Sequence, residues 1–213
     1  ELWQTLTESG LTLAGISEQT GGTGGDVTDS LLVIREAARF AAPVPLAEHF
    51  LAARLLESSG MTVSQPVMTV AIGEFEFNSN GRLTGQADHV AFARWADEII
   101  LVAVRRSRPF VCRVNTSDID ITRGTNLAGE PVDAISVDLN LPDGSFAEAP
   151  EDSDRRLLLM GAALRSLMMA GALESTLQMS VQYAMDRTQF GRPISKFQAI
   201  QHQLAVLAGE SAA

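Results

Sequence analysis

One stretch near the end of the chain, DRTQFGRPISKFQAIQ (Asp186–Gln201), decides the fold. Gly191 follows the last residue of a helical repeat and Pro193 comes two residues later, a combination that ends a helix. Ser195 and Gln198 have the S-x-x-Q spacing of a capping box, which predicts that a second helix begins here. The stretch therefore predicts a sharp corner between two helices.

A plain corner gives no reason for three polar side chains, Arg187, Gln189 and Gln201. An arginine near a helix C-terminus is favourable for the helix dipole, which is a weak structural reason for Arg187. Arg187 and Gln198 can also converge from the two sides of the turn, where a guanidinium and an amide would clamp a phosphate-containing ligand. Phe190 could offer its ring to a flat base. Spacing alone leaves both the structural corner and the ligand site open.

Before the corner, residues 155–189 keep a wide apolar face at helical spacing. A helix of that length spans roughly 50 Å at about 1.5 Å per residue. Such a rod needs bundle partners, so residues 155–213 are predicted to be the beginning of a C-terminal helical bundle. The chain starts without Met and ends within a helical pattern, from which we expect a fragment of a longer protein.

Hydrophobic periodicity divides the rest of the chain into three parts. Residues 1–60 have helical spacing and predict an N-terminal helical domain, with Asp26 or Asp29 as a helix cap and Gly60 as a terminator. Residues 143–154 are rich in acids and proline and predict a solvated linker.

Residues 61–142 consist of short β-branched segments, and NSNG at 78–81 predicts a hairpin turn between two of them. Several short strands at close spacing favour a central antiparallel sandwich or barrel. Because strands and helices occur in separate blocks, the chain is predicted to be an α+β protein and not a doubly wound parallel sheet.

Composition excludes several classes of protein. The net charge of -10 and the pI of about 4.7 argue against a nucleic-acid partner. Cys112 is the only cysteine, so no disulfide or zinc cluster can form within the chain, and a buried Cys112 fits a reducing cytoplasm. No apolar run approaches 18 residues, so no membrane-spanning segment and no membrane partner are predicted. His49, His89 and His202 lack metal-ligand spacing, so no metal site is predicted.

The segment YAMDRTQFGRPISKFQAIQHQLA (residues 183–205) closely resembles the acyl-CoA dehydrogenase family. The family pattern here is Y-x-x-x-R-x-x-F-G-x-P-I-x-x-F-Q-x-I-Q-x-x-L-A. ELWQTLTESGL, GGTGG and GTNLAGEP look like short acyl-CoA dehydrogenase-like proteins of bacteria. The predicted order of helices, β-domain and helices is also that of the family. The resemblance covers most of the chain and corresponds to the middle portion of a family member.

The resemblance implies FAD as cofactor and an acyl-CoA thioester as substrate, into which an α,β double bond is introduced. By position, Arg187 would contact the FAD diphosphate, Gln198 its adenosine part, and Phe190 would pack near the adenine. This corner usually serves the FAD of a neighbouring protomer. The family also implies an electron-transfer flavoprotein or similar acceptor, a homodimer or tetramer or an unlike acyl-CoA dehydrogenase subunit, and a cytoplasmic location.

Three departures from the family pattern leave two interpretations open. The base glutamate would lie beyond Ala213, so no catalytic residue can be assigned. The T-E-P-x-A-G-S-D-like flavin loop is absent, and residues 89–91 (HVA) stand where W-I-T is expected. Ala162 stands at the place of the arginine in the substrate motif. The chain is therefore either an active FAD-dependent acyl-CoA dehydrogenase or a non-catalytic partner subunit with a degenerate flavin pocket in a mixed complex.

Overall fold

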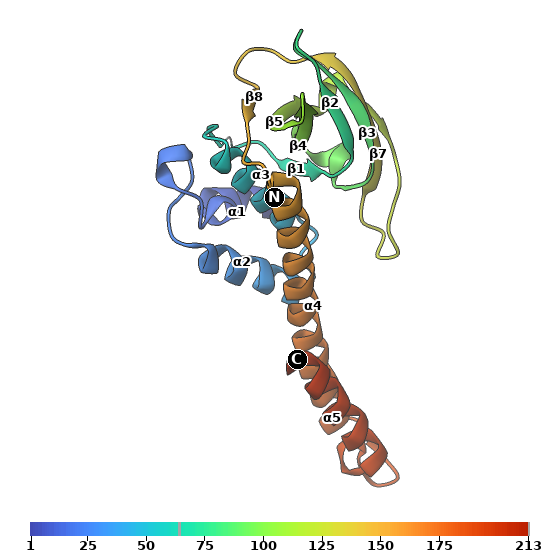
Figure 1. Cartoon of the computed structure of the whole chain (residues 1–213). Coiled ribbons are helices and arrows are strands. Elements are labelled where there is room, and N and C mark those ends of the chain that lie inside the picture. Colours follow the sequence, from blue (N-terminus) through green and yellow to red (C-terminus); the bar gives the residue numbers. More distant parts are fainter. Residues whose placement is uncertain (64, 213) are drawn as a thin grey trace. The chain divides into compact units, whose positions relative to one another are not determined.

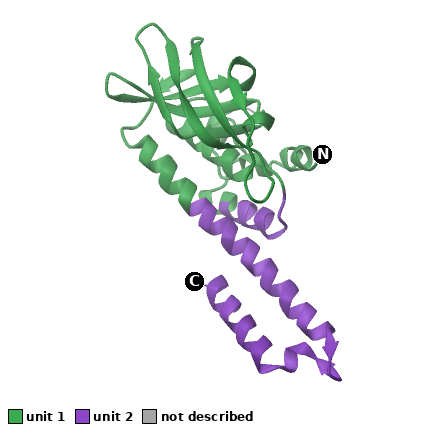
Figure 2. Ribbon diagram, turned by 90° about the vertical axis from the view of Figure 1, so that its right-hand side faces the viewer, with its two compact units in different colours: residues 1–30, 43–162 green, residues 31–42, 163–213 purple. Residues whose placement is uncertain are grey.

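The computed structural model describes residues 1–63 and 65–212, which form two compact units (Figure 1, Figure 2). Unit 1 comprises residues 1–30 and 43–162, and unit 2 comprises residues 31–42 and 163–213. The order of elements confirms the predicted α+β class: helices come first, then a β-sheet, then two further helices.

The N-terminal helices are α1 (Leu2–Glu8), α2 (Val27–Arg39) and α3 (Leu46–Ser58), with short 3-10 turns at Leu11–Leu13 and Glu18–Thr20. Asp26 is the cap of α2, because its carboxylate accepts hydrogen bonds from the backbone N–H groups of Thr28 at 2.7 Å and Asp29 at 3.3 Å. The Asp29 carboxylate accepts the Asp26 N–H at 2.8 Å in return. Asp26 and Asp29, the two residues predicted as alternative caps, thus cap the helix together through reciprocal hydrogen bonds.

Gly60 ends α3, as predicted. Its φ of 71° is left-handed, a conformation that glycine adopts without steric cost. The N–H of Gly60 donates to Glu57 O at 3.0 Å, and the N–H of Met61 donates to Leu56 O at 2.9 Å. These two bonds form a Schellman motif, which satisfies carbonyl groups at the end of the helix.

The sheet of unit 1 has eight strands in the order β6-β7-β3-β2-β4-β5-β8, with β1 paired to β4. The strands are β1 (Met68–Ala71), β2 (Glu74–Phe77), β3 (Arg82–Ala91), β4 (Glu98–Arg105), β5 (Arg108–Asn115), β6 (Asp120–Thr122), β7 (Val132–Asn140) and β8 (Phe146–Glu148). Asn78 Oδ1 accepts the N–H groups of Asn80 and Arg82, which confirms the predicted turn between β2 and β3.

The sheet is mixed, whereas the sequence predicted an antiparallel one. Strands β1 and β2 both pair with β4 in parallel. Strand β3 runs antiparallel to β2, and the chain reverses a second time at the 3-10 turn Ala93–Trp95. Strand β4 therefore runs in the same direction as β2, and it pairs with the edge of β2 that β3 does not occupy. Buried side chains of these strands form the core, including Phe77, Leu83, Ile99, Leu101, Cys112 and Val137.

A buried ion pair joins Arg94, in the turn before β4, to Asp133 in β7. The Asp133 side chain is 0% exposed. Its carboxylate accepts the Arg94 guanidinium, the Arg94 backbone N–H at 3.0 Å and the Gly124 N–H at 3.0 Å. The Arg94 guanidinium also donates to the carbonyl of Gly124. This network ties the turn before β4 to the long β6–β7 loop.

In unit 2, the C-terminal part of α2 contacts α4 (Ser153–Asp186). Arg35 pairs with Glu174 at 2.7 Å, and Arg39 donates to Gln178 at 3.0 Å. At Gly171 the two helix backbones come close enough that an added Cβ would lie 2.5 Å from the carbonyl oxygen of Arg35. Unit 2 ends with α5 (Gln198–Ala212), which follows a small hairpin.

Replacing Gly171 with alanine should destabilise unit 2 by about 1–3 kcal/mol, because the new methyl group forces the two backbones apart. Denaturant unfolding followed by circular dichroism would measure this. Gly161→Ala is a matched control in the same helix, since a Cβ there would meet only Leu51 Cδ1 at 3.8 Å. The Gly161→Ala control should raise the free energy of unfolding by about 1 kcal/mol, because alanine has a higher helix propensity than glycine. Equal stability of the two variants would contradict the close approach at Gly171.

Candidate functional site

The predicted corner is a hairpin and not a bare turn. Helix α4 ends at Asp186, and strands β9 (Thr188–Gln189) and β10 (Arg192–Pro193) then pair antiparallel. Phe190 and Gly191 form the two-residue loop, both with positive φ, as a type I′ turn requires. The Ile194 N–H donates to the carbonyl of Arg187 at 2.8 Å and closes the base of the hairpin. Figure 2 shows α4 and α5 joined by this hairpin.

The capping box predicted at Ser195 and Gln198 was wrong. Ser195 lies in a 3-10 turn (Ile194–Lys196), and Gln198 is already the first residue of α5. Phe197 has the extended conformation of a cap residue, and its carbonyl accepts the Gln201 N–H at 3.1 Å. The Gln201 side chain donates back to the Ser195 carbonyl at 2.9 Å, which gives that glutamine a structural role.

All three predicted cofactor-binding residues, Arg187, Phe190 and Gln198, are exposed. The Arg187 and Gln198 side chains make no hydrogen bond or ion pair with any residue that the structure describes. The Phe190 ring is 92% exposed, although it meets the edge of Phe197 with a centroid distance of 6.2 Å. The corner therefore presents a guanidinium, an amide and an aromatic ring whose contacts within the chain are few.

Phe190 is held in an unfavourable conformation. Its φ of 53° is left-handed, a region that a bulky residue enters at a cost of roughly 1–3 kcal/mol. Because the Phe190 side chain is exposed, its packing within this chain offsets little of that conformational free energy. Strain that packing does not offset is characteristic of sites that bind a ligand or a partner.

The corner is cationic within an acidic chain. From Arg187 to Gly209 the sequence has no Asp or Glu, yet it contains Arg187, Arg192 and Lys196, the only lysine of the protein. None of the three forms an ion pair within residues 1–63 and 65–212. The first backbone N–H groups of α5 add positive potential at the same place. These groups fit a diphosphate, which needs several positive donors near one another.

Sequence reasoning missed Arg192. Its guanidinium lies 4.4 Å from the centre of the Phe197 ring, a cation–π contact that holds the hairpin against the start of α5. The spacing of Arg192 and Phe197, five residues apart across a turn, gives no signal that could have identified this contact.

A groove between α4 and α5 adjoins the corner. It is lined mostly by apolar side chains, among them Met179, Tyr183, Ile200, Leu204 and Leu207. An 18-residue window of α4 has a mean hydropathy of 1.4, and only 17% of it is buried. By length and composition alone, α4 could cross a membrane, whereas the sequence pattern predicted no membrane-spanning segment, because Arg165, Ser166 and Glu174 interrupt the apolar runs of this helix. The core helix of a helical bundle passes the same test, and this is the role that the sequence predicts for α4.

The segments at the flavin-loop positions have structural roles in unit 1. Residues 89–91 lie in β3 at a register shift, where Val90 is buried. Asp97 accepts the Val67 N–H at 2.9 Å and so holds the start of β1. Helix α3 ends at Ser58 and β1 begins at Met68, so the connection between them is short.

Two titratable groups, His49 and Cys112, are buried in unit 1. Burial lowers the pKa of His49 to about 4, and its Nδ1 accepts the Met68 N–H at 3.1 Å, so the imidazole is neutral. Burial raises the pKa of the Cys112 thiol to about 12. No group of three or more His, Cys, Asp or Glu that could hold a metal occurs among the residues the structure describes.

Comparisons with known proteins agree on one family. Residues 1–62 match the model of the acyl-CoA dehydrogenase N-terminal domain, and residues 154–213 match that of the C-terminal domain. Acyl-CoA dehydrogenase IpdE2 of Mycobacterium tuberculosis is 31% identical over 97% of this chain, and IpdE2 of Mycolicibacterium smegmatis is 30% identical over the same share. The chain spans 60% of the length of each.

A solved structure is also similar over nearly the whole chain. The ChsE4-ChsE5 complex from Mycobacterium tuberculosis contains a chain with a TM-score of 0.87 and 26% identity, covering 99% of this chain and 65% of that one.

Proposed function

Because the chain belongs to the acyl-CoA dehydrogenase family, we propose that it takes part in the FAD-dependent introduction of an α,β double bond into an acyl-CoA thioester. The observation that carries the proposal is the corner between α4 and α5. There an unpaired arginine, an exposed strained phenylalanine and an acid-free cationic stretch occur together. A cytoplasmic location and an electron-transfer flavoprotein or similar acceptor belong to the same proposal.

In this proposal the chain's own residues hold and orient the dinucleotide. Arg187 donates its guanidinium fork to the diphosphate, where two N–H groups can meet two phosphate oxygens. Phe190 packs its ring against the adenine, and Gln198 hydrogen-bonds the adenosine part through its amide. FAD, when bound, supplies the acceptor for the hydride that leaves the acyl chain. We assign none of the described residues as the base that removes the α-proton.

A second candidate function is that of a partner subunit without its own catalytic site. The absence of the T-E-P-x-A-G-S-D-like loop from the sequence and the structural use of residues 89–91 favour it, because in the family that loop contacts the flavin ring. The similarity to a chain of a two-protein complex also supports it. In that case the corner would hold FAD whose flavin ring lies in a pocket of the other subunit.

Absorbance and activity separate the two candidates. Full-length protein purified alone should show flavin absorbance near 450 nm and should reduce an artificial electron acceptor with an acyl-CoA substrate. If the partner-subunit function holds, the protein alone should be colourless and inactive, and both flavin and activity should appear with a second acyl-CoA dehydrogenase chain. Lack of flavin binding both alone and in such a complex would reject both candidates.

A further inference from the structure

The ring of Phe190, in the loop of the hairpin, has one aromatic neighbour among the described residues. That neighbour is Phe197, with a centroid distance of 6.2 Å and an interplanar angle of 81°. The rest of the Phe190 side chain is open, since 92% of the residue is exposed. A ring that is already held in one orientation loses less conformational freedom when it stacks on a nucleotide base. The orientation of Phe190 within this chain therefore depends on that of Phe197.

The backbone of Phe197 is held at the start of α5. Its N–H donates to the carbonyl of Ile194 at 3.1 Å, and its own carbonyl accepts the N–H groups of Ile200 at 3.0 Å and Gln201 at 3.1 Å. These bonds fix the Cα atom of Phe197, but backbone hydrogen bonds leave the side-chain torsion angles free to choose among rotamers. The orientation of the Phe197 ring therefore needs a side-chain contact.

Arg192 makes that contact. It lies in β10 opposite Gln189, and its Cζ is 4.4 Å from the centre of the Phe197 ring. This is well within the distance of about 6 Å at which a ring face attracts a cation. The two side chains meet because the 3-10 turn Ile194–Lys196 lies between them and turns the chain. Arg192 thus covers one face of the ring that Phe190 meets.

No carboxylate of the corner draws Arg192 away from that ring. The guanidinium makes no hydrogen bond or ion pair within residues 1–63 and 65–212, and residues 187–209 contain no Asp or Glu. The nearest acid before this stretch, Asp186, accepts the side-chain amide of Gln182 at 2.9 and 3.0 Å. The aromatic contact is therefore the interaction that determines where the Arg192 side chain points.

We propose that Arg192 is a positioning residue for FAD: it holds the Phe197 ring, and Phe197 holds the Phe190 ring in the orientation that stacks on the adenine. This inference rests on the proposed function, in which Phe190 packs against the adenine. The family pattern F-G-x-P has no fixed residue at position 192, so the resemblance implies no role for Arg192. Arg192 acts through two aromatic rings, whereas Arg187 contacts the ligand directly.

The dissociation constants of FAD and ADP test this role, because ADP is the part of FAD that carries the adenine and the diphosphate. Both are titrated calorimetrically into the full-length apoprotein, or into the mixed complex if FAD binds only there. Arg192→Gln should weaken the binding of both ligands about two- to fivefold more than Lys196→Gln does. Lys196→Gln is the matched control, because it removes the same charge from the same acid-free stretch, and Lys196 makes no cation–π contact among the described residues.

Variants of Phe197 show whether Arg192 acts through this ring. Phe197→Leu should weaken the binding of both ligands. In the Phe197→Leu protein, Arg192→Gln should then lower the affinity no more than Lys196→Gln does, because the ring that the arginine holds is gone. Phe197→Tyr keeps an aromatic ring and should bind both ligands as the wild type does. If Arg192 instead contacted a phosphate, its effect would be undiminished in the Phe197→Leu protein.

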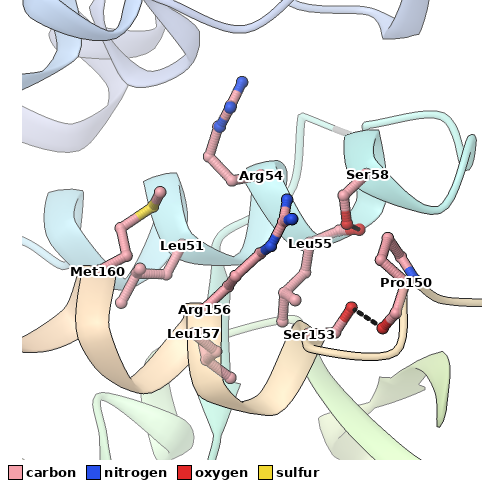
Figure 3. A pocket seen from close by; sticks show the side chains of 9 residues that line it. All are labelled: Leu51, Arg54, Leu55, Ser58, Pro150, Ser153, Arg156, Leu157 and Met160. Atoms are coloured by element: carbon pink, nitrogen blue, oxygen red, sulfur yellow. Dashed lines mark hydrogen bonds between the residues drawn. The ribbon is translucent and has the colours of Figure 1, made fainter.

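Arg156→Gln is a control for the loss of an arginine as such. Its Nε binds Asp152 at 2.8 Å, and the residues drawn around it in Figure 3 include no aromatic ring. This variant should bind FAD with wild-type affinity.

Two results would overturn the inference even if Arg187→Ala releases FAD and the proposed function stands. One is an equal loss of affinity in the Arg192→Gln and Lys196→Gln proteins, and the other is an undiminished effect of Arg192→Gln in the Phe197→Leu protein. If the wild type binds neither FAD nor ADP, alone or in the mixed complex, this inference and the proposed function both fail.

Discussion

Replacing Arg187 with alanine is expected to release most of the FAD from the purified protein, or from its mixed complex if FAD binds only there. The guanidinium has no partner among the described residues, so its removal leaves no buried group unpaired and should not disturb the fold. Hydrogen bonds to a charged group contribute about 1.5–3 kcal/mol. FAD should therefore bind roughly 10- to 150-fold more weakly. Flavin absorbance near 450 nm per mole of protein, measured after gel filtration, gives the result.

Two further variants make this prediction specific. Arg187→Lys keeps the charge but loses the two-pronged geometry, so it should retain an intermediate amount of flavin. Arg155→Ala, at an exposed position on the first turn of α4, should retain all of it. If Arg187→Ala and Arg155→Ala proteins carry the same flavin content, Arg187 does not bind FAD, and the proposed corner site fails.

Local sequence signals predicted the fold well because each depends on a few neighbouring residues. The Asp26 cap, the Gly60 stop and the Asn78 turn were all read from short patterns whose hydrogen bonds close within six residues. The separate blocks of strands and helices then gave the α+β class. These signals did not require knowledge of any contact distant in sequence.

Contacts distant in sequence, or set by packing, were missed. The parallel pairing of β1 with β4 depends on where the chain re-enters the sheet, which no local pattern encodes. The capping box failed because the hairpin places Phe197 against Arg192, and this packing moves the start of α5 past Ser195. For the site, the sequence named Arg187, Phe190 and Gln198, but the strained φ of Phe190 became visible only with the hairpin.

Replacing Asp133 with alanine is expected to destabilise unit 1 by about 3–5 kcal/mol, because it removes one partner of a buried ion pair. The Arg94 guanidinium would lose its carboxylate, and the N–H groups of Arg94 and Gly124 would lose their acceptor. Asp138→Ala is a matched control in the same strand, since the Arg82–Asp138 pair has more than half of each side chain exposed. The Asp138→Ala control should lower the free energy of unfolding by no more than about 1 kcal/mol, because exposed ion pairs contribute little. Urea unfolding of both variants measures the two costs.

The pH dependence of the same comparison provides an independent check. Burial desolvates Asp133 and opposes its ionisation, but the hydrogen bonds from Arg94 and Gly124 outweigh this and lower the pKa of Asp133 in the folded protein. A lowered folded pKa adds stability that is complete above the unfolded pKa of about 3.9 and is lost as the pH falls through the folded value. The difference in unfolding free energy between wild type and Asp133→Ala should therefore be constant near neutral pH and shrink below about pH 4. A difference that stayed constant in acid would mean that the Asp133 carboxylate is not ionised in the fold, and that its role is steric.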